Sequence, residues 1–169
     1  MTPIREDFAG QRQLRFRVAR KPLHIFKAKG ESTHQVFLKV LAFAFYSDRA
    51  ELQFEPRLPG KLQPTLAEID FTGDVKRWVQ VGLPPYEKIE HVLRHTAADE
   101  VCIVLECPSE ADEDVSDYVA ELAARIKRHI HYRYTTGKLK LLVFEPLESW
   151  FDPEADVDPH PAHHVFYSF

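Results

Sequence analysis

The sequence lacks any long apolar run and contains only two cysteines. No stretch reaches the roughly eighteen apolar residues that a membrane span needs, and residues 1–10 lack the apolar segment of a signal peptide. We therefore expect a cytoplasmic protein with no membrane partner. Cys102 and Cys107 are five residues apart, on a predicted strand and just beyond it, so their side chains point to opposite faces. Both thiols are predicted to be buried and reduced.

The chain also lacks the excess of positive charge that is typical of general nucleic-acid-binding proteins. Its formal net charge is −4, but residues 5–39 contain nine Lys and Arg against three acids, and the segment from Glu148 onward contains five acids and no Lys or Arg. A basic N-terminal face could contact phosphates, which makes Arg15, Arg17 and Lys39 candidate nucleic-acid-binding residues. The alternative is a solvated edge strand protected by basic side chains, which is the more frequent arrangement.

With 169 residues, of which 44% are hydrophobic, the chain is long enough to bury a substantial core. We expect a single domain over residues 1–169, with a core over about residues 22–145 and an acidic, His-containing C-terminal tail over residues 147–169. Within this tail, a loose group of Asp and His side chains around His160 is a weak candidate for Zn²⁺, because prolines exclude a helix there. The apolar end, residues 165–169, is expected to dock on the sheet or on a partner.

Hydrophobic periodicity predicts the order of helices and strands. Ser32 followed by Gln35 is a capping box, and the helix that it opens is apolar on almost every side as far as Phe45, as expected of a buried central helix. The other predicted elements are strands at 14–18, 23–27 and 52–54, a hairpin at 64–82, a helix from 85 or 86, a buried strand at 101–105, an amphipathic helix at 115–130 and a buried strand at 139–144. Together they predict an α/β fold in which helices flank a mixed β-sheet with parallel crossovers.

The hairpin is the part of the chain where we expect function to be decided. With a two-residue loop at Thr72 and Gly73, its register places Thr65 opposite Gln80. A cross-strand hydrogen bond between these two side chains is a simpler interpretation than metal ligation.

Five separated blocks of this sequence resemble the YaeQ family. They occur between about Pro22 and Leu105, in the family's order, and consist of Glu31-Ser32 with 36–45, then 49–54, 64–66, 70–74 and 78–84. The order of elements, with a buried helix before a central hairpin, is similar to that of the PD-(D/E)XK restriction-endonuclease-like core. The resemblance therefore implies that fold, with a mixed sheet flanked by helices.

The resemblance also implies the positions of a nuclease-like site. On this fold, a carboxylate on the first hairpin strand and a Glu or Gln on the second hold Mg²⁺ or Mn²⁺, beside a Lys and often a further acid from the first helix. These positions are Glu31, Thr65, Gln80 and Lys88 in this sequence, and Asp70 and His91 are secondary candidates. Thr65 and Gln80 stand where the family pattern has acids, and their neutral oxygens bind hard cations weakly.

The sequence thus predicts a degenerate metal site without a cofactor. We expect a non-catalytic module that binds nucleic acid or a protein partner; the alternatives are an active Mg²⁺- or Mn²⁺-dependent nuclease and a purely structural module. Each site residue also has a structural interpretation. An acid such as Glu31 is favoured at the start of a helix whatever the function, Asp70 is placed to cap a turn, and Lys88 and His91 fit a solvated helix face.

Overall fold

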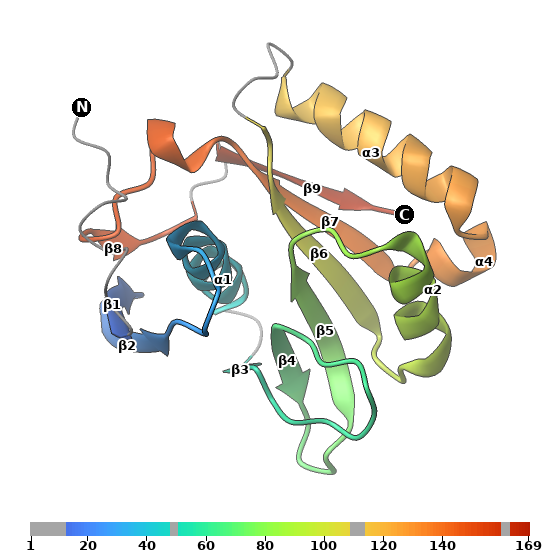
Figure 1. Ribbon diagram of the computed structural model, residues 1–169, viewed down its shortest axis with the longest axis horizontal. Helices are drawn as coiled ribbons and strands as arrows, with labels where there is room; N and C mark the ends of the chain where they lie inside the picture. The colour runs from blue at the N-terminus through green and yellow to red at the C-terminus, as the bar shows by residue number, and fades with distance from the viewer. Residues whose placement is uncertain (1–12, 48–50, 109–113, 160–162) are drawn as a thin grey trace.

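In the part of the chain that the structure describes, two β-sheets and three long helices make up an α/β architecture (Figure 1). The structure is a computed structural model that describes residues 13–47, 51–108, 114–159 and 163–169. The strands are β1 (Gln13–Val18), β2 (Lys21–Phe26), β3 (Leu52–Phe54), β4 (Leu66–Ile69), β5 (Val75–Val81), β6 (Glu100–Glu106), β7 (Leu139–Phe144), β8 (Asp156–Val157) and β9 (His164–Ser168). The helices are α1 (Thr33–Tyr46), α2 (Tyr86–His95), α3 (Val115–His129), the short α4 (Tyr132–Thr135) and the 3₁₀ turn Leu147–Ser149.

The larger sheet has the strand order β3-β4-β5-β6-β7-β9. Strands β3, β4 and β5 are antiparallel, whereas β5, β6 and β7 are parallel and connected through α2 and α3, so the predicted parallel crossovers are confirmed. Strand β6 is buried on both faces, as predicted. The apolar C-terminal segment forms β9, which pairs antiparallel with β7, so its predicted docking on the sheet is also confirmed.

Helix α1 is enclosed because it lies between the two sheets (Figure 1). Ser32 caps it through the predicted capping box with Gln35. On one side its apolar residues pack against Leu66 and Val79 of the larger sheet, and on the other Phe37 contacts Phe16 of β1 at a ring distance of 6.0 Å. Helices α2 and α3 cover the opposite face of the larger sheet. This arrangement explains why α1 is apolar on almost every side, whereas α2 and α3 are amphipathic.

The smaller sheet, with the order β2-β1-β8, corrects the expectation of a single sheet with a basic edge strand. Strand β1 is central, and β8 from the acidic C-terminal segment pairs in parallel with it, which places Arg17 beside Asp156. The backbone N–H of Arg20 also donates to the Asp156 carboxylate, at 3.0 Å from each oxygen. Basic and acidic segments that are far apart in the sequence are thus neighbours in the fold.

The hairpin of β4 and β5 keeps the predicted register near the candidate site, but the predicted two-residue loop is wrong. Leu66 pairs with Val79, as the prediction requires, whereas Ile69 pairs with Val75 because β5 contains a bulge. The turn is closed by a hydrogen bond from the N–H of Asp70 to the carbonyl of Asp74 at 2.9 Å. One extra loop residue and one bulged residue compensate, so the register is restored toward Thr65.

Both cysteines are free and buried, as predicted. In the described part of the chain, none of the helices has the length and apolarity that a membrane crossing requires.

Candidate functional site

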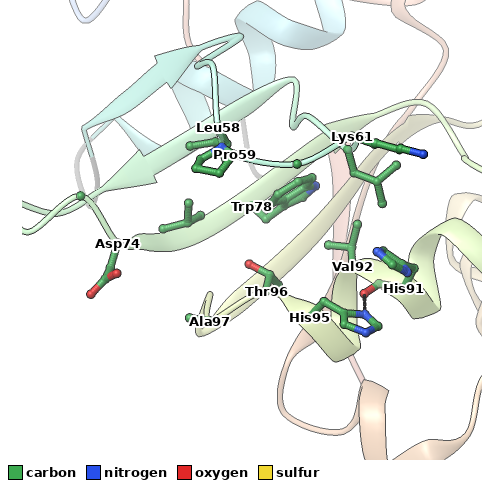
Figure 2. Close-up of a pocket in the computed structure, with 14 residues that line it drawn as sticks. Leu58, Pro59, Lys61, Asp74, Trp78, His91, Val92, His95, Thr96 and Ala97 are labelled. Carbon is green, nitrogen blue, oxygen red and sulfur yellow. Dashed lines mark hydrogen bonds between the residues drawn. The ribbon is translucent and has the colours of Figure 1, made fainter.

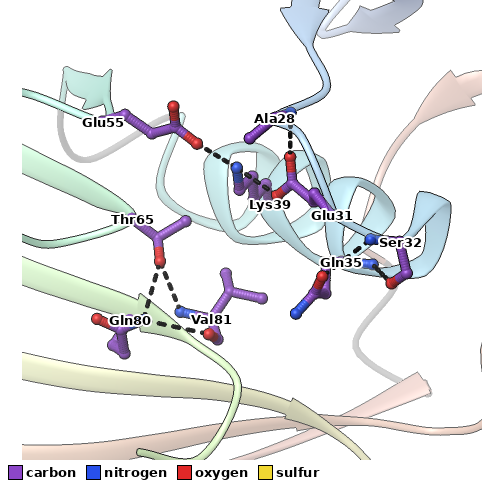
Figure 3. A network of polar contacts seen from close by, with 9 residues as sticks. All are labelled: Ala28, Glu31, Ser32, Gln35, Lys39, Glu55, Thr65, Gln80 and Val81. Carbon is purple, nitrogen blue, oxygen red and sulfur yellow. Dashed lines mark hydrogen bonds and ion pairs between the residues drawn. The ribbon is translucent and has the colours of Figure 1, made fainter. Parts of the chain in front are cut away.

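Thr65 and Gln80 face each other at the open end of the hairpin (Figure 3). The amide Nε2 of Gln80 donates to Oγ1 of Thr65 at 3.2 Å, and the backbone N–H of Val81 donates to the same oxygen at 3.1 Å. Because a hydroxyl oxygen has two acceptor lone pairs, both are used within the protein. The carbonyl of Val81 also accepts from Gln80 Nε2, at 3.3 Å, which favours the amide orientation that points nitrogen toward Thr65. The predicted pairing is confirmed, and it is a hydrogen bond.

Glu31 lies at the start of α1, but its partner is the ammonium group of Lys39 (Figure 3). Lys39 Nζ is 2.5 Å from Oε1 of Glu31, and the side chains are only 6% and 9% exposed. The other carboxylate oxygen of Glu31 accepts from the backbone N–H of Ala28 at 2.9 Å. Glu31 is therefore a buried, internally paired acid. An acid that only interacts with the helix dipole would be exposed to solvent, whereas Glu31 is not.

Lys39 also forms an ion pair with Glu55, whose side chain is 54% exposed. The backbone N–H of Glu55 donates to the carbonyl of Thr65 at 2.8 Å, so this acid lies directly beside the hairpin site. Glu55 was not predicted from the sequence. Its signal was the strand register, because Glu55 follows β3, and β3 pairs with the strand that Thr65 precedes. Lys39 was predicted to contact nucleic acid together with Arg15 and Arg17, but its side chain is buried, whereas the two arginines are exposed on β1.

Lys88 and Gln80 line one narrow crevice between α2 and the sheet. Pro84 and the buried residues Ile89 and Trp78 complete its walls. The crevice has a volume of about 10 Å³, which is about the space of a single water molecule. A hydrated Mg²⁺ with several of its own waters does not fit there.

The two secondary candidates lie away from the Thr65–Gln80 pair. Asp70 belongs to the hairpin turn, where Oδ1 accepts from the backbone N–H groups of Thr72 and Asp74, both at 2.9 Å. The side-chain hydrogen bond from Thr72 contributes most to lowering the pKa of Asp70 to about 2. His91 is exposed on α2 and stacks on His95 at a ring distance of 4.2 Å. It lines a separate pocket of about 450 Å³ whose floor includes Trp78 (Figure 2).

The basic candidates Arg15 and Arg17 lie on the exposed face of β1. With Gln13 and His24 they line a shallow depression, and Glu154 from the acidic segment also contributes to it. The positive charge of this surface is therefore partly balanced.

The His-containing tail is only partly described, since His160 lies outside the described residues. His163 has its Nδ1 3.0 Å from a carboxylate oxygen of Glu145, and its ring stacks on Trp150 at 4.6 Å. Among the residues that the structure describes, His, Cys, Asp and Glu side chains nowhere form a group of three or more that could hold a metal ion.

A second polar cluster, on the α1 face of the sheet, was also missed. Tyr46 donates to Oε1 of Glu100 at 2.6 Å, Nε of Arg77 lies 3.0 Å from the same oxygen, and its guanidinium covers the Tyr46 ring at 4.6 Å. Burial raises the pKa of the neighbouring thiol of Cys102 to about 12. The signal was parity, because Arg77 shares a strand face with the buried Val79. The cluster lies on the strand face opposite to that of Gln80.

Comparisons with known proteins are consistent with this architecture. A family model described as YaeQ protein matches residues 11–132, more than two thirds of the chain. The crystal structure of the YaeQ protein from Xanthomonas axonopodis pv. citri is similar, with a TM-score of 0.60 and 16% sequence identity, covering 93% of this chain and 89% of the other. The YaeQ protein from Pseudomonas syringae gives a TM-score of 0.56 at 15% identity, covering 92% and 86%. No curated protein sequence matches the chain significantly.

Proposed function

Since this chain belongs to the YaeQ family, we propose that it is a non-catalytic binding protein on a PD-(D/E)XK nuclease-like core. The observation that carries this proposal is the hydrogen bond from Gln80 to Thr65 at the place where the core would hold its metal. Mg²⁺ and Mn²⁺ are hard cations that prefer carboxylate oxygens and retain several waters. The Gln80 amide and the Thr65 hydroxyl are both neutral, and the two lone pairs of the hydroxyl already accept hydrogen bonds from Gln80 and Val81.

The nearby acids support the same proposal, because they already share a cation. The ammonium group of Lys39 lies between Glu31 and Glu55 and supplies positive charge from within the chain. A divalent cation bound beside it would be repelled by the ammonium group in a poorly solvated environment. Binding there would require Lys39 to leave its position or to lose its proton. The crevice between Gln80 and Lys88 is too narrow to hold a hydrated ion instead.

Nucleic acid is the partner that we propose for this module. Exposed Arg15 and Arg17 on β1 are the contact residues, and Lys39 has no part in it because it is buried. Contacts of this kind release counterions from phosphates, so the affinity decreases as the salt concentration increases. The acidic side chains of the neighbouring β8 segment weaken the local positive potential, so we expect modest affinity.

Divalent-ion calorimetry combined with a cleavage assay tests the loss of catalysis. The protein is titrated with Mg²⁺ and with Mn²⁺, and incubated with single- and double-stranded DNA and RNA at the same ion concentrations. We expect no binding heat and no cleavage above an ion-only control. Metal-dependent cleavage that is lost in Glu31→Gln or Gln80→Ala would instead establish the alternative, an active nuclease in which Lys88 and an acid such as Asp70 complete the site.

Charge reversal tests the nucleic-acid surface. The variant Arg15→Glu/Arg17→Glu should lose nucleic-acid binding and its salt dependence, while Arg128→Glu on α3 serves as an exposed control on another face. Equal affinity of the double variant and the natural protein would remove β1 from the interface. Lack of binding by the natural protein at low salt would leave a protein partner as the alternative.

A further inference from the structure

Phe71 is fully exposed, at 101% of its reference surface, on the tip of the β4–β5 hairpin. An aromatic side chain in water forgoes roughly 1.5–3 kcal/mol that burial would provide. Phe71 contributes nothing to the core, so the fold itself does not explain why a phenylalanine is there. Large exposed apolar groups of this kind serve as anchors in protein interfaces.

The tip that carries Phe71 is held in one conformation. The carboxylate of Asp70 accepts from the N–H groups of Thr72 and Asp74 and from the Thr72 hydroxyl at 2.5 Å, and Lys76 Nζ lies 3.3 Å from its other oxygen. Gly73, with a φ of +91°, completes the turn in a conformation that other residues rarely adopt. Because the tip is ordered in advance, burying Phe71 in a partner loses little conformational entropy.

A pocket beside the same hairpin has the properties of a receptor for such an anchor (Figure 2). Its volume is about 450 Å³, within the range of specific ligand pockets. Trp78 forms the floor and Leu58, Leu62 and Val92 form apolar walls, while Lys61 and His91 line the side of the pocket away from Asp74.

The wall of this pocket is also ordered in advance. The side chain of Gln63 accepts from the N–H of Leu58 at 2.8 Å and donates to the carbonyls of Leu58 and Gly60 at 2.8 and 3.0 Å. These hydrogen bonds hold the loop of residues 58–62 against the pocket. An occupant therefore meets a preformed surface.

We propose that the occupant is Phe71 of a second copy of this chain, so that two chains exchange their hairpin tips. Asp70 at the tip already pairs with Lys76, so the complementary charges are Asp74 at the tip of one copy and Lys61 on the pocket rim of the other.

The position of the anchor relative to the pocket favours a second copy over an unrelated protein. Gly73 and Asp74 line the pocket, and Phe71 precedes them by two and three residues. Anchor and receptor thus belong to the same end of the hairpin, and a two-fold axis beside this end could place each Phe71 in the partner's pocket. This reciprocal contact does not depend on the site at Thr65 and Gln80. Two tips and two pockets make a small interface, so we expect weak, reversible association.

Concentration-dependent NMR tests this proposal with a built-in control. The chain has two tryptophans, so its spectrum contains two indole N–H signals. Dilution should shift the signal of Trp78, on the pocket floor, and leave that of Trp150 unchanged, while sedimentation velocity reports the change from dimer to monomer. A protein that is monomeric at millimolar concentration would overturn the proposal.

Phe71→Ala should weaken self-association at least about tenfold, as expected for the loss of a buried aromatic anchor. Its thermal unfolding should be unchanged, because Phe71 is fully exposed in the single chain. The matched control is Phe26→Ala, which removes another exposed ring, 69% exposed, from β2. Association that survives Phe71→Ala, or that is weakened equally by Phe26→Ala, would contradict the proposal.

Lys61→Glu tests the receptor side, since it reverses the charge of an exposed rim residue. It should weaken association, and the mixture of Lys61→Glu with Phe71→Ala should associate more strongly than Phe71→Ala alone, because one intact anchor then meets one intact pocket. Dilution shifts of Trp78 that persist in both single variants would mean that the pocket has another occupant, and the proposal would be wrong.

Discussion

The Thr65 hydroxyl oxygen accepts a hydrogen bond from the amide Nε2 of Gln80 at 3.2 Å. The two positions that face each other across the hairpin are therefore joined by a neutral hydrogen bond. Two facing acids at these positions would repel each other unless a cation lay between them. In this chain the requirement for a cation is absent. The acids that remain nearby, Glu31 and Glu55, are neutralised by Lys39. The charges of the site are therefore satisfied within the protein.

Glu31→Ala should destabilise the protein by about 2–4 kcal/mol, because it removes the buried partner of a buried ammonium group. An acid at the start of a helix that contributes only through the helix dipole would be worth less than about 1 kcal/mol. The measurement is the free energy of unfolding from urea denaturation monitored by circular dichroism.

Glu55→Ala is the matched control, since it removes the other carboxylate partner of Lys39. Glu55→Ala should lower the free energy of unfolding by less than about 1 kcal/mol, because this side chain is 54% exposed and its ion pair is screened by solvent. An equal decrease in the free energy of unfolding for Glu31→Ala and Glu55→Ala would contradict this account. It would show that Lys39 does not pair more strongly with Glu31 than with Glu55.

Asp70→Asn should destabilise the protein at neutral pH, and this difference should disappear in acid. The native pKa of Asp70 is lowered from 3.8 to about 2, chiefly by the hydrogen bond from the Thr72 side chain. A carboxyl group with a lowered native pKa contributes stability that is fully present above its unfolded pKa and is lost as the pH falls through its native pKa. The stability curves of the two proteins should therefore converge between about pH 4 and pH 2. Carboxyl NMR titration of Asp70 checks the midpoint, and a midpoint near 4 would contradict the account of the turn.

Cys102 should resist alkylation in the folded protein. Burial raises its pKa from 9.0 to about 12, and its side chain is completely inaccessible. Because the thiolate is the reactive form, iodoacetamide at pH 8 should modify folded Cys107→Ala protein at least about a hundredfold more slowly than the urea-unfolded protein. Similar rates in the two states would mean that this part of the core opens readily.

Elements whose signals are local could be predicted from the sequence. The capping box of Ser32 and Gln35 located the start of α1, and the continuous apolar run of residues 101–105 identified a strand covered on both faces. The pairing of Thr65 with Gln80 was also predicted correctly. The predicted loop length was wrong, but the extra loop residue and the bulge in β5 compensate for each other. These features depend on residues that are close together in the sequence.

The features that were missed depend on contacts between distant segments. Nothing local in residues 156–157 indicates that they pair with β1, which turns a predicted edge strand into a central one. The partner of Glu31 is Lys39, which was predicted from its basic character to contact nucleic acid. The sequence shows which side chains are charged and which segments are extended. It does not show their partners, because these are determined by how the two sheets pack around α1.

The measurement that tests the central claim most directly is a Mn²⁺ titration of thermal stability in two proteins. The variant Thr65→Asp/Gln80→Glu should be less stable than the natural protein without metal, because it places two carboxylates at facing positions. Mn²⁺ should then raise its melting temperature in a concentration-dependent way, since a ligand that binds only the native state stabilises it. The natural protein should not respond to the ion. An equal response of both proteins, or none in the variant, would show that these two side chains do not occupy an emptied metal site.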